Sequence, residues 1–167
     1  MSLSFRRATP ADMNAITALL HEVFRPTYGH ILTEPQIAFM LSSIFSQAHM
    51  EQQMNGEGHQ FIMAYDGKQL AGFAALEYNF HKERAICKLH KLYLTVPMQG
   101  KGLGKALLQE VIRLAKENGQ QYLILNVNRG NKAKAFYEAQ GFHIRETVDI
   151  PLENGYYMND YIMQLEL

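Results

Sequence analysis

The sequence predicts one domain of the mixed α/β (α+β) class. Segments with helical and strand-like patterns follow one another in the order β-α-α-β-β-β-α-β-α-β-β. Residues 122–127 (YLILNV) are nearly all apolar, as expected for a strand that is buried on both faces. The 167 residues are enough to build one proper core, and no linker-like segment separates a second unit. We therefore assign residues 1–167 to a single domain.

The N-terminal third predicts one strand and two helical regions. A short strand is expected over residues 3–8. Thr9 is a favourable N-cap and Pro10 suits the first helical position, so a helix should begin there. Its apolar spacing should be broken by Pro26 to Gly29. A second helical region, capped by Thr33, is expected from there to about residue 54.

The rest of the chain predicts two hairpins around a central strand–helix–strand unit. Residues 60–65 and 69–78 should pair through the turn dipeptide Asp66-Gly67. A long strand is expected over about 84–94, followed by a helix over about 102–118 that Gly119 ends. The remaining expected elements are the strand 122–127, a short helix 132–140, and a last hairpin made of 142–150 and 156–165.

Residues 89–105 (LHKLYLTVPMQGKGLGK) carry most of the functional information. They read as a strand that runs into a glycine-rich turn, which then opens an amphipathic helix. Backbone N–H groups at a helix N-terminus are unpaired, and the helix dipole adds partial positive charge there. Glycines remove the side chains that would keep a pyrophosphate away. This segment therefore predicts a phosphate-bearing cofactor.

The two common nucleotide-binding loops do not fit this segment. Gly100, Gly102 and Gly104 form G-x-G-x-G, so the third glycine of the dinucleotide fingerprint falls on Lys105. A P-loop requires four residues between its glycines, and then a lysine followed by Ser or Thr. Here three residues separate Gly100 from Gly104, and Ala106 follows Lys105. Both readings fail on spacing.

Two motifs resemble those of the GNAT N-acetyltransferases of the bacterial small-molecule type. Residues 99–104 (QGKGLG) match Q/R-x-x-G-x-G/A, the pyrophosphate loop for coenzyme A in that family. Residues 131–142 (NKAKAFYEAQGF) resemble its second signature, N-x-x-A-x-x-F-Y-x-x-x-G-F. The resemblance covers nearly the whole chain. It implies the GNAT fold, with a mostly antiparallel central sheet flanked by helices, and acetyl-CoA held between splayed strands.

The resemblance also implies which residues hold the cofactor. Main-chain groups of Leu92 and Leu94 should bind the pantetheine arm and the acetyl carbonyl. The asparagine of the second signature falls one residue late, because Gly130 occupies its usual position. Asn131 could still reach the pantetheine amides, or Asn126 could replace it. The other expected cofactor residues are Gln99, Gly100, Lys101, Gly102, Leu103, Gly104, Lys105, Lys134, Phe136 and Tyr137.

Acetyl transfer to an amine requires a proton donor for the leaving thiolate and a base for the amine. Tyr137 matches the family tyrosine that acts as the general acid. The family glutamate that serves as base is replaced by Lys88. His90 lies two residues along, on the same face of the strand, and its intrinsic pKa near 6.5 suits proton transfer. Glu77 and a chain of water molecules remain as alternatives.

Composition narrows the partners and the location. The formal net charge is zero, which gives no support for nucleic acid or a membrane surface as partner. No apolar run approaches the length needed to span a membrane, and no signal peptide is recognisable. The single cysteine, Cys87, suits a reducing compartment, so we expect a cytoplasmic protein. The histidines show no metal-ligand spacing, and we expect no metal site.

These observations and the resemblance together predict an enzyme. It should move an acetyl group from acetyl-CoA to a primary amine of a small molecule by direct attack. Acetylation of a peptide or protein amine is the main alternative, and a non-catalytic CoA-binding sensor or interaction module is another. Residues 155–161 should border the acceptor pocket or form a dimer contact, which leaves a homodimer open.

Overall fold

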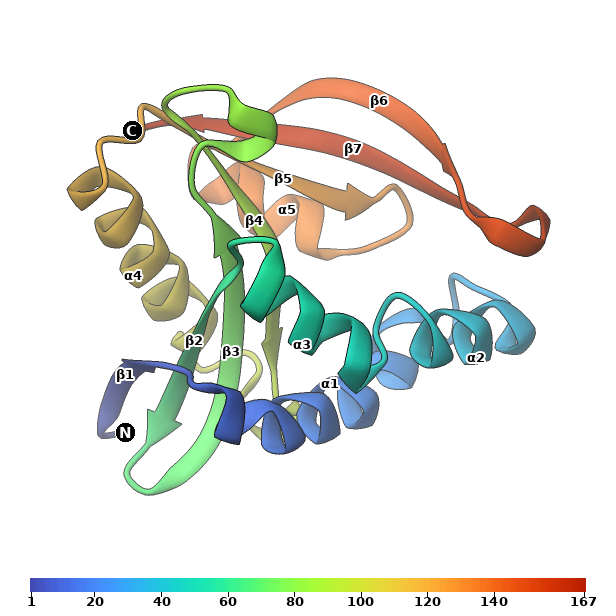
Figure 1. Cartoon of the computed structure of the whole chain (residues 1–167), viewed down its shortest axis with the longest axis horizontal. Coiled ribbons are helices and arrows are strands. Elements are labelled where there is room, and N and C mark those ends of the chain that lie inside the picture. The colour runs from blue at the N-terminus through green and yellow to red at the C-terminus, as the bar shows by residue number, and fades with distance from the viewer.

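The computed structural model describes residues 1–167 and contains one seven-stranded sheet (Figure 1). The strand order is β1-β2-β3-β4-β5-β7-β6. Every neighbouring pair is antiparallel except β4 and β5, which are parallel, so the expected mixed and mostly antiparallel sheet is confirmed. The strands are β1 Leu3–Arg7, β2 Gln60–Asp66, β3 Gln69–Glu77, β4 Ile86–Leu94, β5 Tyr122–Asn128, β6 His143–Pro151 and β7 Tyr157–Glu166.

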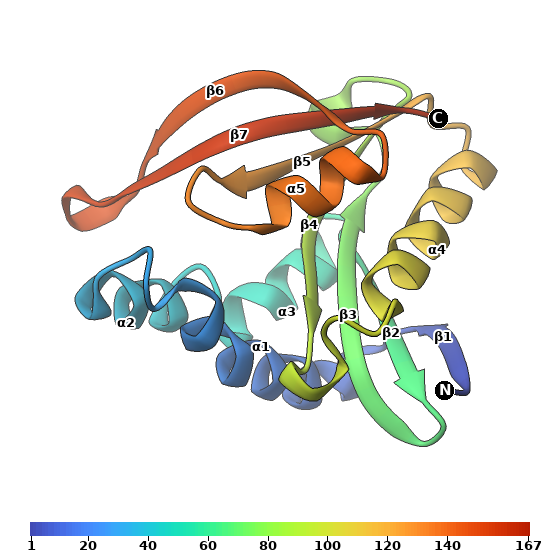
Figure 2. The same cartoon turned by 180° about the vertical axis from the view of Figure 1, so that it is seen from behind.

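Five α-helices cover the two faces of the sheet (Figures 1 and 2). They are α1 Met13–Tyr28, α2 Glu34–Ser42, α3 Gln47–Gly56, α4 Leu103–Glu117 and α5 Ala133–Ala139. Helices α1 to α3 share one buried cluster with β2 and β3, and α4 and α5 share a second cluster with β3, β4, β5 and β7. Cys87 is fully buried in the second cluster, as small core residues commonly are. None of the helices combines the length and apolar character that membrane crossing requires.

The predicted bounds of the N-terminal helices were only partly right. The first helix ends at Tyr28 with Gly29 as its C-cap, within the break expected over Pro26 to Gly29, although Pro26 itself still lies inside the helix. The region expected as one long helix is two helices, α2 and α3. Ser46 caps the second of them by accepting a hydrogen bond from the backbone N–H of His49 at 3.2 Å, and this local cap restarts the helix.

The first helix also begins later than expected. Thr9 and Pro10 open a short 3-10 turn over Pro10–Asp12, and α1 starts only at Met13. Asp12 holds the turn by accepting a hydrogen bond from the backbone N–H of Thr9 at 2.8 Å. The capping signal was therefore read correctly, but it belongs to the turn that precedes the helix.

The central feature of the sheet is the separation of β4 from β5. Their pairing runs from Ile86 opposite Tyr122 to Leu89 opposite Leu125 and then stops. The edge of β4 that faces β5 consequently has no partner strand over residues 90–94. This separation is the splay that the resemblance implied.

A β-bulge lies where the two strands part. Lys91 is opposite Ala75 of β3, and Leu89 is opposite Leu76, so His90 is an extra residue in β4. The bulge interrupts the alternation of side chains. Leu89 packs with the cluster beneath α4, whereas Lys91 and Tyr93 point toward the cluster under α1 to α3. Polar side chains thereby reach the centre of the protein.

Candidate acetyl-CoA and acceptor sites

A cavity of about 550 Å³ fills the space between the separated strands. It runs from the end of β4 and the glycine loop to β5 and α5. Most residues that the sequence predicted for the cofactor and for catalysis line it. These are His90, Leu92, Leu94, Gln99, Gly100, Gly102, Gly104, Lys105, Asn126, Asn131, Phe136 and Tyr137.

The glycine loop forms an anion cradle at the start of α4. Gly100 and Gly102 have φ values of +74° and +87°, a conformation that favours glycine. The first hydrogen bond of the helix runs from the N–H of Ala106 to the carbonyl of Gly102, so the preceding N–H groups donate to no protein acceptor. Gln99 donates a side-chain hydrogen bond to the carbonyl of Leu94 at 3.3 Å, which ties the loop to the end of β4. The arrangement suits a pyrophosphate.

Three predicted cofactor residues have side chains outside this cavity. Leu103 is fully buried in the core under α4, so only its backbone belongs to the cradle. Lys101 is exposed and does not line the cavity. Lys134 forms an ion pair with Glu138 at 3.1 Å and lies over the ring of Tyr161. Lys105 is the lysine of the predicted set that does line the cavity.

The structure explains the shifted asparagine. A Cβ atom at Gly130 would lie 3.1 Å from Cγ2 of Ile31, so a side chain at this position would press on the loop after α1. Asn131 lines the cavity, and its side-chain oxygen accepts a hydrogen bond from the N–H of Ala133 at 2.9 Å. Asn126 also lines the cavity, and its side-chain oxygen is buried without a partner. Of the two, Asn126 has the free acceptor.

Helix α5 positions Tyr137. The ring lies in the core, and the residue also lines the cavity. The ring packs against Phe136 and Phe142, and only 8% of the residue is exposed. Burial raises the pKa of Tyr137 above its usual value. The phenol therefore stays protonated at neutral pH and can act as a proton donor.

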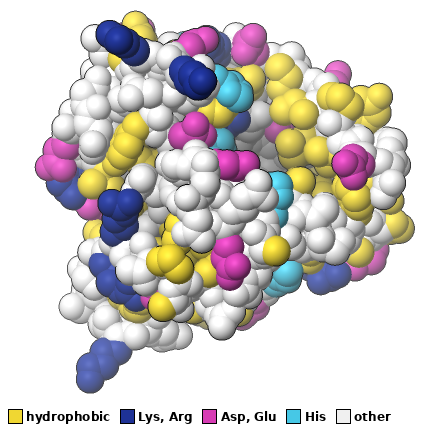
Figure 3. Space-filling view, viewed as in Figure 1, with side chains coloured by type: hydrophobic (Ala, Val, Ile, Leu, Met, Phe, Trp, Pro, Cys, Tyr) yellow, Lys and Arg dark blue, Asp and Glu magenta, His cyan; other side chains and the backbone are white.

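A second cavity, of about 300 Å³, lies on the other side of β4. Side chains of α1, α2 and α3 and of the β6–β7 hairpin line it. Figure 3 shows hydrophobic side chains gathered over the far half of that hairpin, where Tyr157 is 50% exposed. The two cavities share the lining residues Tyr28, Leu89, His90, Lys91, Tyr93 and Asn126. The two cavities therefore share a wall at the bulge of β4.

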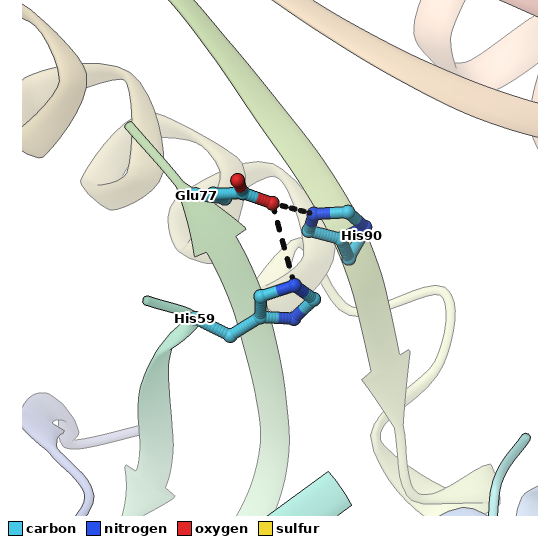
Figure 4. Close-up of side chains that lie close together, drawn as sticks. All are labelled: His59, Glu77 and His90. Atoms are coloured by element: carbon cyan, nitrogen blue, oxygen red, sulfur yellow. Dashed lines mark hydrogen bonds and ion pairs between the residues drawn. The ribbon is translucent and has the colours of Figure 1, made fainter. Parts of the chain in front are cut away.

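His90 belongs to a compact cluster with Glu77 and His59 (Figure 4). Nε2 of His90 lies 2.9 Å from Oε1 of Glu77, and Nε2 of His59 lies 3.3 Å from the same oxygen. The two imidazole rings stack with centroids 4.0 Å apart. When Nε2–H of His90 donates to the carboxylate, Nδ1 carries the lone pair and is the basic nitrogen. The two residues proposed separately from sequence, His90 and Glu77, thus form one unit.

The electrostatic surroundings keep this cluster in its neutral-histidine form. Burial, followed by the charges of neighbouring groups that include Lys88 and Lys91, lowers the pKa of His90 well below its usual value. Burial lowers the pKa of His59 to about 4. The three ligand-type atoms lie within 4.8 Å of one another, an arrangement that sequence spacing did not reveal. The two adjacent ammonium groups oppose binding of a cation there.

Several site residues escaped sequence reasoning. Lys91 is 5% exposed and lines both cavities, and Tyr28 and Tyr93 place their hydroxyl oxygens 3.3 Å apart on the shared wall. In a regular strand, the side chains of His90 and Lys91 would point to opposite faces. Only the bulge in the structure shows that both residues reach the shared wall. His59 lies 31 residues before His90 in sequence and shows no motif. No local pattern could have identified these residues.

Comparison with known proteins identifies the family. A family model described as an acetyltransferase (GNAT) domain matches residues 31–165. The chain belongs to the GNAT family of acetyltransferases. It is an N-acetyltransferase, and acetyl-CoA is its acyl donor.

The names of individual relatives give different substrates. A spermidine N(1)-acetyltransferase of Thermoplasma acidophilum is 26% identical over 152 residues, which cover 88% of this chain and 92% of that protein. A [ribosomal protein bS18]-alanine N-acetyltransferase of Haemophilus influenzae is 29% identical, with coverage of 61% and 64%. An uncharacterised N-acetyltransferase of Methanocaldococcus jannaschii is 32% identical, but the match covers 53% of this chain and only 40% of that protein.

Solved structures confirm the GNAT fold. The PaiA N-acetyltransferase of Thermoplasma acidophilum in complex with coenzyme A matches with a TM-score of 0.82 and 23% identity, over 100% of both chains. The YncA acetyltransferase of Salmonella typhimurium, solved with acetyl-CoA, matches with a TM-score of 0.68 and 20% identity, over 99% and 94% of the two chains.

The cradle predicts a specific effect of Gly102→Ala. A Cβ at this left-handed position costs about 1 kcal/mol of backbone strain and displaces the N–H groups that face the pyrophosphate. We expect acetyl-CoA to bind about tenfold more weakly, measured by calorimetric titration. Gly119→Ala is the matched control, because Gly119 has a φ of +72° at the other end of α4 and open space around it. Equal affinities in the two variants would contradict the cradle.

Lys91 predicts a pH dependence of stability. Burial lowers its pKa from 10.5 to about 8, so the folded protein holds this proton less tightly than the unfolded chain does. The protonated lysine therefore costs stability below pH 8, and the cost is relieved as the pH rises from 8 to 10.5. Relative to Lys91→Met, the wild type should gain about 2 kcal/mol of unfolding free energy between pH 7 and pH 10, measured by urea unfolding. Lys116→Met, at an exposed position on α4, should show no such change.

Proposed function

We propose that the protein transfers the acetyl group of acetyl-CoA to a primary amine of a small molecule by direct attack, without a covalent enzyme intermediate. One observation carries the proposal: the cofactor cavity and the second cavity share a wall at the bulge of β4, where His90 and Asn126 lie. A thioester on one side and an amine on the other can be brought together there.

Tyr137 is the proposed general acid. As the amine adds to the thioester carbonyl and the C–S bond breaks, the thiolate of coenzyme A needs a proton. The phenol of Tyr137 lines the cofactor cavity, and its raised pKa keeps the proton available. Exposed N–H groups on the unpaired edge of β4 near Leu92 are the proposed donors to the carbonyl oxygen, which gains negative charge in the transition state.

His90 is the proposed general base, and Glu77 is the residue that positions it. Nδ1 of His90 would take the proton from the attacking amine while Nε2–H remains bound to Glu77 at 2.9 Å. His59 supports the pair by stacking on His90. A water chain from the cavity is the alternative route for the same proton.

A small acceptor is favoured by the size of the second cavity and by the contacts that border it. The side-chain amide of Gln36 on α2 donates a hydrogen bond to the carbonyl of Tyr157 on β7 at 2.9 Å, and the rings of Phe39 and Tyr156 pack 5.5 Å apart. These contacts join α2 to the turn between β6 and β7 beside the cavity. A volume of about 300 Å³ is at the lower end of the range for small-molecule sites. A peptide N-terminus is the second candidate, supported by the ribosomal-protein relative.

Replacement of Tyr137 tests the acid. Tyr137→Phe should lower kcat about 100-fold and leave the Kd of acetyl-CoA within twofold, because the ring still fills its place in the core. The measurement is release of the coenzyme A thiol with an amine acceptor, paired with calorimetry. Tyr122→Phe, on β5 and outside both cavities, is the matched control and should retain full activity. Unchanged kcat in Tyr137→Phe would remove the proposed role.

Replacement of His90 tests the base. His90→Gln should lower kcat/KM about 100-fold, and Glu77→Gln should also lower it, because the ring then loses the carboxylate that fixes its tautomer. His143→Gln, at an exposed position of β6, serves as the control. If His90→Gln and Glu77→Gln both keep more than a third of the wild-type kcat/KM, a water chain is the base and the assignment of His90 is wrong.

A further inference from the structure

A buried lysine that forms no ion pair lines the second cavity. Lys91 is 5% exposed, and its ammonium donates a hydrogen bond to the side-chain oxygen of Gln53 at 2.9 Å. The same ammonium lies 5.7 Å from the ring centre of Phe45 and 5.8 Å from that of Phe61. No carboxylate forms an ion pair with it. Buried charges in proteins are normally paired, because an unpaired one costs several kcal/mol.

Lys88 is a second lysine among the residues that line this cavity. Its Nζ lies 4.5 Å from the ring centre of Phe80, and it also has no carboxylate within ion-pair distance. Asp160 is the one acidic residue that lines the cavity. Its carboxylate accepts a hydrogen bond from the side-chain amide of Asn126 at 3.3 Å. Two lysines and one carboxylate therefore line this cavity, and the carboxylate of Glu77 lies outside the lining, where it is bound to His90.

The remainder of the lining is mostly apolar. It comes from α1 and α2, from the segments before and after α2, and from β7. The residues that give it this character are Phe24, Leu32, Met40, Ile44, Phe45 and Met158. A ligand that complements the cavity therefore has an apolar body, an anionic group for the lysines and an amine that reaches the bulge.

We propose that the acceptor is an α-amino acid with a medium-sized apolar side chain, such as leucine, methionine or phenylalanine. Its carboxylate pairs with Lys91 and Lys88, its side chain lies among the apolar residues, and its amine faces His90. The inference rests on the proposed function and narrows its substrate class. A polyamine is disfavoured, because its ammonium groups would meet two lysines and one carboxylate.

The reaction balances with these groups alone. The lone pair of the amine attacks the thioester carbonyl carbon, an N–C bond forms and the C–S bond breaks. The amine proton leaves through His90, and the thiolate takes a proton from Tyr137. The products are an N-acetyl amino acid and free coenzyme A, and no oxidant or reductant is involved. The product keeps its carboxylate opposite the two lysines.

The test compares leucine with two analogues that are changed only at the carboxylate and with one polyamine. Leucine, leucinamide, 3-methylbutylamine and spermidine are offered to the enzyme with acetyl-CoA, and thiol release is followed. We expect kcat/KM for leucine to exceed that for leucinamide by tenfold or more. The amide has the more acidic ammonium group and so presents more free amine, which biases the comparison against this result.

The variants test whether the lysines cause the preference. In Lys91→Met and Lys88→Met the leucine-to-leucinamide ratio should fall toward one, whereas the control Lys116→Met should keep the wild-type ratio. Circular dichroism and thermal unfolding establish whether each variant is folded. Because two lysine variants are measured independently, the test still stands if one of them does not fold. An unchanged ratio in both folded variants would overturn the inference.

The outcomes separate this inference from the function on which it rests. If kcat/KM for leucinamide, 3-methylbutylamine or spermidine equals or exceeds that for leucine, the carboxylate plays no part. The inference then falls, while small-molecule acetylation stands. If none of the four compounds releases thiol but a peptide with a free N-terminus does, both are overturned. Preference for leucine that disappears with Lys91 supports both.

Discussion

The site depends on one interruption in the sheet, the end of pairing between β4 and β5 after Leu89. Backbone N–H and C=O groups at the centre of a sheet are normally satisfied by the neighbouring strand. Here the edge of β4 beyond Leu89 is left without one, and the cofactor cavity occupies the gap. The protein gives up ladder hydrogen bonds at its centre. In the proposed binding mode, the pantetheine arm and the thioester replace them, and the glycine cradle holds the pyrophosphate of the same cofactor.

The bulge at His90 turns this gap into a two-sided site. Without the extra residue, alternate side chains of β4 would continue to face α4 and α1 in strict order. With it, His90 and Lys91 both reach the wall that the two cavities share. Bulges commonly redirect side chains next to active sites. In this protein, the same bulge brings a neutral imidazole held by Glu77 and a buried ammonium group into adjacent positions.

Polar groups at this junction are held at a cost to stability. Nδ1 of His59 and Oδ1 of Asn126 are buried without hydrogen-bond partners, and Lys91 forms no ion pair. Each of these costs free energy. Two large apolar clusters on either side of the sheet supply the compensating stability. A concentration of unsatisfied groups at one place in an otherwise well-packed core is what a preorganised binding site requires.

The sequence by itself determined the order of the elements, the glycine cradle and the tyrosine of α5, because these depend on local spacing and on backbone conformations that only certain residues adopt. Gly100, Gly102 and Tyr137 could be read without a structure. The break between α2 and α3 was missed because Ser46 caps locally within a continuous apolar pattern. Only the tertiary structure decided where β4 leaves β5, that His59 and Glu77 meet His90, and that Lys91 is buried between two cavities. These features arise from strand register and from contacts between residues far apart in the chain, and periodicity in one strand carries no information about either.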